Sequence, residues 1–222
     1  MMKNLLGVFF LLLLAGCFSS PQPDRWKSES AKAFERYKEH TLKGKKLLAK
    51  HELNQARSYA AEGGDLKRMA SIMLGACTLE KILYKKSSAC KEYKELQSVH
   101  TSPKIASYDA LVHKKYADVH IEALPKRYRT FAKALINKDF QTANKALKEQ
   151  KNPQTMLVEL YLLGTDSDDE TLKTALQHFR MYGYKEAILY VLHVELARSH
   201  SQRVKEKLKK EIAILKKSGE LE

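Results

Sequence analysis

Two pairs of histidines have the side chains of a helical metal site but not its spacing. His113 and His120 lie seven residues apart in one predicted helix, and His193 and His200 repeat that interval. Metal-binding pairs on a helix usually lie at i and i+4, as in H-E-x-x-H, whereas seven residues separate two rings by about 10 Å of helix rise. We therefore expect surface or core histidines and no metal site.

Four carboxylates, Asp166, Asp168, Asp169 and Glu170, could be taken for a calcium loop. They lack the alternating ligands, the central glycine and the distal glutamate of an EF-hand. Ser167-Asp168-Asp169-Glu170 has instead the form of a capping box, in which side chains satisfy the free N–H groups at the start of a helix. We predict a helix cap here.

Two glutamates, Glu159 and Glu195, lie in apolar stretches and are the candidates for a general acid. A lone glutamate on a helix edge is usually solvated. The sequence contains no Gly-x-Ser-x-Gly motif, no phosphate-cradling loop, no Ser-x-x-Lys and no Cys-x-x-Cys-His for c-type haem. We therefore predict a non-enzymatic protein without catalytic residues or cofactors.

The amino terminus has the pattern of an export signal. Lys3 precedes about ten apolar residues, 5–14 (LLGVFFLLLL), which is too short for the ~20 residues that span a bilayer. Leu14-Ala15-Gly16-Cys17 follows directly and resembles the bacterial lipobox. The resemblance implies a signal peptide over residues 1–16, cleavage before Cys17, a diacylglycerol thioether on Cys17 and acylation (palmitate) of the new amino terminus. Two or three acyl chains anchor a protein firmly.

Residues 17–23 are predicted to be a lipidated tether, because two prolines and two serines in this stretch resist helix formation. Phe18, rather than Asp, follows the lipid-bearing cysteine. In enterobacterial lipoproteins this resembles the pattern sorted to the outer membrane. The expected location is therefore the cell envelope: the outer membrane facing the periplasm in a host with two membranes, or the outer face of a single membrane.

Cys77 and Cys90 remain as an even pair once the first cysteine carries lipid, and an oxidising periplasm favours a disulfide between them. If residues 85–88 form the turn between antiparallel helices, Cys90 lies opposite Leu83, and Cys77 is about 9 Å further along its helix. A disulfide needs Cα atoms within ~7 Å. The bond therefore requires the helix to break early, near Gly75, and two separately buried thiols are the alternative.

The chain is strongly basic, with a net charge of +14. Removing the leader from 222 residues leaves about 206, enough for one domain with a real core or two small ones, and lowers the charge to about +13. Basic residues are densest from 198 to 217, which suggests either a solvated helix face or a surface for anions. Export argues against nucleic acid as the partner. The residues assigned to an anionic-partner surface are Arg203, Lys205, Lys207, Lys209, Lys210, Lys216 and Lys217.

Apolar residues recur at helical spacing from residue 24 to the end, and nothing in the sequence indicates a strand. We predict an all-α domain over 24–222, with a possible subdivision near 100–103. Gly44 and Gly183 are among the predicted helix stops. Ser102-Pro103 is a predicted start, from which spacings of three and four continue to Ala123 and predict one long helix.

Three turn regions resemble parts of the tetratricopeptide repeat. Residues 138–143 (KDFQTA) match the turn and second helix of that repeat, and residues 64–66 (GDL) and 183–187 (GYKEA) match parts of it. The period departs from a steady ~34 residues. The resemblance implies stacked antiparallel helical hairpins, as a tetratricopeptide-like α-α superhelix or an irregular helical bundle, without membership of the family.

Three functions are compatible with these features. The first is a lipid-anchored scaffold that binds another envelope protein or an anionic envelope component through the groove between hairpins and the basic last helix. The second is an envelope enzyme acting on glycan, with Glu159 or Glu195 as the acid in a deep cleft. The third is a carrier of an apolar ligand, which needs a sizeable apolar cavity inside the helical stack.

Overall fold

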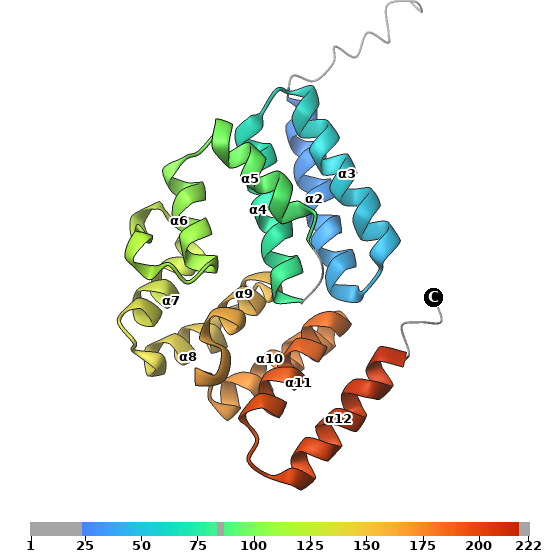
Figure 1. Cartoon of the computed structure of the whole chain (residues 1–222), viewed down its shortest axis with the longest axis vertical. Coiled ribbons are helices and arrows are strands. Elements are labelled where there is room, and N and C mark those ends of the chain that lie inside the picture. The colour runs from blue at the N-terminus through green and yellow to red at the C-terminus, as the bar shows by residue number, and fades with distance from the viewer. Residues whose placement is uncertain (1–23, 84–86, 218–222) are drawn as a thin grey trace, which may run out of the picture.

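The structure, a computed structural model, describes residues 24–83 and 87–217 (Figure 1). These residues form eleven α-helices and three short 3-10 helices and contain no strand, which confirms the predicted all-α class. The signal peptide, Cys17 and the tether predicted for residues 1–23 lie outside the described residues. Within the described ranges no helix is both long and apolar enough to cross a membrane.

The first five helices form the upper part of the molecule in Figure 1. They are α2 (Arg25–Lys43), α3 (Lys46–Glu62), α4 (Leu66–Ile82), α5 (Ala89–Val99) and α6 (Pro103–Val112). α2 and α3 pack against each other as a hairpin, α5 packs on α4, and α4 also contacts α6 and α9.

Two short 3-10 helices, η1 (Tyr116–Asp118) and η2 (Ile121–Ala123), pack against α6. The elements that follow form the lower part. They are α7 (Lys126–Ile136), α8 (Phe140–Glu149), α9 (Pro153–Leu163), η3 (Gly164–Asp166), α10 (Asp169–Tyr182), α11 (Lys185–Arg198) and α12 (Gln202–Lys217). α7 and α8 form a hairpin, as do α10 and α11, and α11 also contacts α2, which links the two parts.

One turn conformation recurs at five helix ends. In each, a residue in the left-handed region is followed by a residue with ψ between 67° and 80°, whose N–H bonds to the carbonyl five residues earlier. This hydrogen bond gives a partner to a backbone carbonyl that would otherwise have none at the end of the helix. The left-handed residues are Gly44, Gly64, Lys114, Lys138 and Gly183. The three turns that carry the tetratricopeptide resemblance all belong to this set.

The long helix predicted from Ser102 to Ala123 is wrong. α6 stops at Val112, because Lys114 takes φ 59° and the Lys115 N–H bonds to the Ala110 carbonyl. The chain then turns back, and Ser107 Oγ of α6 donates to the His120 carbonyl (2.8 Å) and accepts from the His120 N–H (3.0 Å). Because the left-handed residue here is a lysine and not a glycine, the sequence does not indicate that the helix ends at this point.

Cys77 and Cys90 form a disulfide, with Cα atoms 4.6 Å apart, so the predicted bond is confirmed. The predicted break near Gly75 is wrong, because α4 continues through this position to Ile82. Cys90 lies in the first turn of α5, and this turn packs beside Cys77 on the unbroken α4. The turn predicted for residues 85–88 falls partly outside the described residues.

The core is one continuous cluster of buried side chains with members from α2 to α11. Its largest fully buried side chains include Phe131 and Phe179. The boundary predicted near 100–103 coincides with an extended link between α5 and α6, and side chains on both sides of that link belong to the same cluster. α12 packs through a separate, smaller cluster on α11.

Candidate functional site

α12 is attached to the fold along one edge, as its narrow apolar stripe predicts. Its buried side chains, Leu208 and Ile212, pack against Leu189 and Leu192 of α11. Val204, on the same stripe, remains 45% exposed. Most of the circumference of α12 therefore faces solvent.

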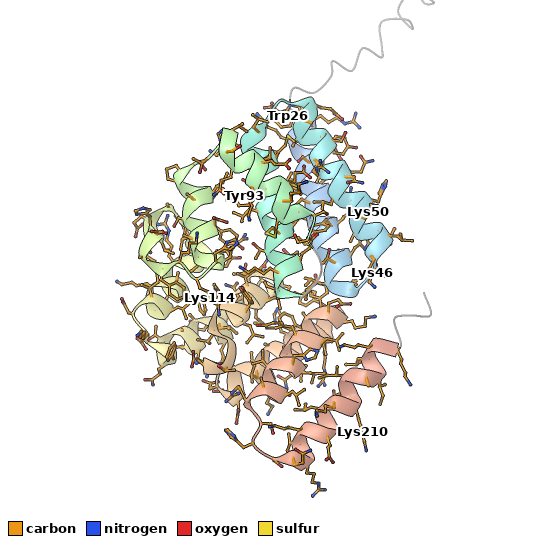
Figure 2. The ribbon with its side chains drawn as sticks, viewed as in Figure 1. Trp26, Lys46, Lys50, Tyr93, Lys114 and Lys210 are labelled. Carbon is orange, nitrogen blue, oxygen red and sulfur yellow. A yellow bond between two sulfur atoms is a disulfide. The ribbon has the colours of Figure 1, made fainter. Side chains whose placement is uncertain are left out.

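The seven basic residues selected from the sequence all lie on α12, and all except the half-buried Lys205 are exposed. Four of them recur at intervals of four, three and seven residues, which places them along the side of the helix opposite the buried Leu208 and Ile212. We call these four the outer basic stripe: Arg203, Lys207, Lys210 and Lys217. Figure 2 labels Lys210, in the middle of the stripe. The other three residues, Lys205, Lys209 and Lys216, lie nearer the buried side of the helix.

Carboxylates of the fold do not neutralise this stripe. Glu206 of α12 accepts a hydrogen bond from Gln202 (3.1 Å), and Glu211 lies 3.4 Å from Arg180 of α10. Among the residues that the structure describes, none of the seven basic side chains has a carboxylate within 4.0 Å. Repulsion among uncompensated like charges favours the arrival of an anion.

The position of α12 separates it from the expected anchor. α2, which follows the predicted tether, begins at the upper end of the molecule, and α12 lies at the lower end (Figure 1). Ile214, 68% exposed, adds an apolar side chain between the basic residues of the stripe.

Glu195 lies in a hollow of about 750 Å³ between α10, α11 and α12. Burial raises the pKa of Glu195, and the nearby Glu211 raises it further. The hollow is also lined by Asp169 and Arg198, which form an ion pair of 3.0 Å. The glycan-enzyme hypothesis requires a deep cleft around such a glutamate, and it stays a prediction.

Glu159 lies in the middle of α9 and is 1% exposed. Its Oε1 accepts a hydrogen bond from Gln150 Nε2 (3.4 Å), and its Oε2 has no hydrogen-bond partner among the described residues. Burial raises the pKa of Glu159 to about 8, against the opposing effects of Gln150 and Arg127. The carboxyl has almost no surface that a substrate could touch.

The two histidine pairs do not lie on single helices, so that part of the prediction is wrong. His113 follows the last residue of α6 and bonds to Asp109, whereas His120 precedes η2. His193 lies on α11, but His200 lies in the link before α12. In the described part of the chain, no group of three or more His, Cys, Asp or Glu residues could hold a metal ion.

The acidic cluster before α10 caps that helix, as predicted, but the capping residue is Asp168 rather than Ser167. Asp168 Oδ1 accepts from the Thr171 N–H (2.6 Å), while Ser167 Oγ donates to the Gly164 carbonyl (2.8 Å). Glu170 forms an ion pair with Lys148 of α8 (2.6 Å). These carboxylates therefore join α10 to its neighbours.

Asn144, a buried residue of α8, has a role that the sequence analysis missed. Its Nδ2 donates to the carbonyls of Phe140 (2.8 Å) and Asp166 (3.0 Å), and its Oδ1 accepts from the Asp168 N–H (2.8 Å). A buried amide with three bonds fixes the start of α10 on α8. The signal was an asparagine beside Ala143 on an otherwise apolar stripe.

No family model, curated protein or solved structure matches this chain. Lipid attachment at Cys17 stays a prediction, because that residue lies outside the described ranges. The geometry of α12 and the buried groups described above therefore provide the basis for a functional proposal.

Proposed function

We propose that this protein is a lipid-anchored envelope protein that acts as a non-enzymatic scaffold. Cys17 would hold it in the membrane, and the outer basic stripe of α12 would bind an anionic partner, either another envelope protein or an anionic envelope component. The observation that carries the proposal is a set of seven basic side chains on one helix, six exposed and one half-buried, without a carboxylate partner among the described residues.

The arrangement of the molecule supports a partner away from the anchoring membrane. Seven residues of tether, 17–23, reach about 25 Å at most, and α2, which follows them in the chain, begins at the end of the fold opposite α12. The body of the protein would then separate the basic stripe from the headgroups near the anchor.

The binding surface is tested by site-specific photocrosslinking in intact cells. A photoreactive residue replaces Ile214, which is 68% exposed on the stripe, and a matched probe replaces Met181, which is 75% exposed on α10. We expect a specific adduct from position 214 and none from position 181. Equal adduct yields from the two positions would argue against a localised surface.

Charge-reversal variants then distinguish binding that depends on the outer basic stripe from binding that depends only on the net positive charge of the chain. Arg203→Glu, Lys207→Glu, Lys210→Glu and Lys217→Glu, combined, should reduce the adduct at position 214 about tenfold or more, because rim charges set the rate of encounter. The control reverses four exposed lysines elsewhere and changes the net charge by the same amount: Lys94, Lys133, Lys145 and Lys151. An unchanged adduct in the stripe variant would refute the proposal.

The anchor is tested by the mass of the purified native protein and by labelling with an alkyne analogue of palmitate. We expect a chain that starts at Cys17 and carries lipid, and loss of the label in Cys17→Ser. A native protein that retains Met1, or a variant that still incorporates the label, would contradict the lipid anchor. This outcome is independent of the crosslinking result.

A further inference from the structure

A second cavity, of about 290 Å³, lies at the junction of five helices, α2, α4, α6, α7 and α9. Its walls are mainly apolar, with Phe34, Leu79, Ile105 and Val158 among them. Gly75 belongs to the same wall, and a Cβ at this position would lie 2.6 Å from Phe34 Cζ. The absence of a side chain there lets the Phe34 ring lie directly on α4.

The hydroxyl groups of the walls already have hydrogen-bond partners. Ser71 Oγ donates to the Lys67 carbonyl (2.9 Å), Thr78 Oγ1 to the Leu74 carbonyl (2.8 Å), and Thr155 Oγ1 to Asn152 Oδ1 (3.1 Å). The hydroxyls of Tyr108 and Tyr128 lie 3.5 Å from each other. The donors that remain for a ligand are therefore mainly those of charged side chains.

The residues that line the cavity include four cations and no carboxylate: Lys38, Lys67, Lys104 and Arg127. Lys38 is paired with Glu35 (2.6 Å) and lies over the Phe34 ring. The other three are exposed and have no carboxylate within 4.0 Å among the described residues. Burial lowers the pKa of Lys38, and the charge of Arg127 lowers it further. The lining therefore combines an apolar interior with positive charge that no lining carboxylate balances.

We infer that this cavity binds a single-chain amphipathic anion, a fatty-acid-like carboxylate, with the acyl chain inside and the carboxylate at Lys67, Lys104 and Arg127. A neutral apolar ligand would leave the three cations uncompensated. A polar phosphate compound would lose hydrogen bonds to water against apolar walls. A peptide carboxyl terminus would bring backbone N–H and C=O groups for which the engaged hydroxyls offer few partners.

The test measures decanoate binding to the full-length protein in nanodiscs of phosphatidylcholine by isothermal titration calorimetry, with empty nanodiscs as the blank. We expect saturable binding of one decanoate per chain. Lys104→Gln with Arg127→Gln should weaken it about tenfold, because charge-assisted contacts to the carboxylate are lost. Lys133→Gln with Lys145→Gln, exposed lysines on α7 and α8, is the matched control and should leave the affinity unchanged.

A second variant tests the apolar interior. Ser71 is exposed at the wall, so Ser71→Trp should obstruct the cavity without disturbing the core, and far-UV circular dichroism verifies folding. We expect this variant to bind neither decanoate nor decanol, and the Lys104/Arg127 variant to lose affinity for decanoate alone.

Three results would overturn the inference: no decanoate binding above the blank, equal affinity in the Lys104/Arg127 variant and its control, or tighter binding of acetyl-Leu-Leu than of decanoate. The last result would assign the cavity to a peptide carboxyl terminus. None of these results bears on the crosslinking at α12, because the two surfaces share no residue.

Discussion

Glu159→Gln should make the protein more stable at alkaline pH and leave its stability at pH 5 nearly unchanged. The carboxyl is 1% exposed, and burial raises its pKa from 4.5 to about 8. The folded protein therefore holds a proton at Glu159 between these two values that the unfolded chain has already released. Because the folded state binds more protons in this window, the free energy of unfolding must fall as the pH rises from about 4.5 to about 8.

The size of the effect follows from the interval between the two pKa values. Each pH unit in the window costs about 1.4 kcal/mol, so the penalty is roughly 3 kcal/mol at pH 7 and approaches roughly 5 kcal/mol above pH 8. Glutamine keeps the shape of the side chain and its contact with Gln150 but carries no charge. The variant should therefore lack this part of the pH dependence.

Urea unfolding followed by circular dichroism from pH 4.5 to pH 9 measures the difference between parent and variant. Glu149→Gln, an exposed glutamate on the adjoining α8, is the control and should show no such divergence. Curves for parent and Glu159→Gln that stay parallel, within about 1 kcal/mol over this range, would refute the assignment of a buried, protonated carboxyl.

Three further predictions concern stability. Cys77→Ala with Cys90→Ala should lower the free energy of unfolding by about 3 kcal/mol, because the bond closes a loop with a sequence separation of 13; equal urea midpoints with and without reductant would contradict this. Gly63→Ala should displace Trp26, since the new Cβ would lie 2.3 Å from the indole. We expect a red-shifted emission from this single tryptophan and a loss of about 1–3 kcal/mol; an unshifted spectrum would argue against the contact. Asn144→Ala should cost about 2–4 kcal/mol, because it removes the three hydrogen bonds made by a buried amide. Asn137→Ala, at an exposed position in the α7–α8 turn, is the control, and equal unfolding midpoints would contradict the role of Asn144.

Helix ends determined by local chemistry were predictable from the sequence. Gly44 and Gly183 take the left-handed conformation that was expected of them, and Ser102 caps the helix that begins at Pro103. The apolar stripe of α12 and its basic outer side also follow from spacing alone, so this candidate surface could be located before any tertiary contact was known.

Features that depend on tertiary contacts or on non-glycine turns were not predictable. Lys114 ends α6 in a conformation that the sequence assigns to glycine, and the Ser107–His120 bonds that hold the reversed chain join residues thirteen apart. The cavity lined by Lys104 and Arg127 combines residues from several helices, whose proximity no periodicity reveals. Local patterns therefore predict the helices, whereas the cavity depends on the packing between them.

The weak attachment of α12 has a mechanical consequence. Its apolar contact with α11 involves four buried side chains, supplemented by the 3.4 Å pair of Arg180 and Glu211, whereas the main core runs without interruption from α2 to α11. Elements with few buried contacts open at lower free energy than the rest of a fold. If α12 binds a partner as proposed, a pulling force applied through that partner would detach α12 from α11 before it opened the main core.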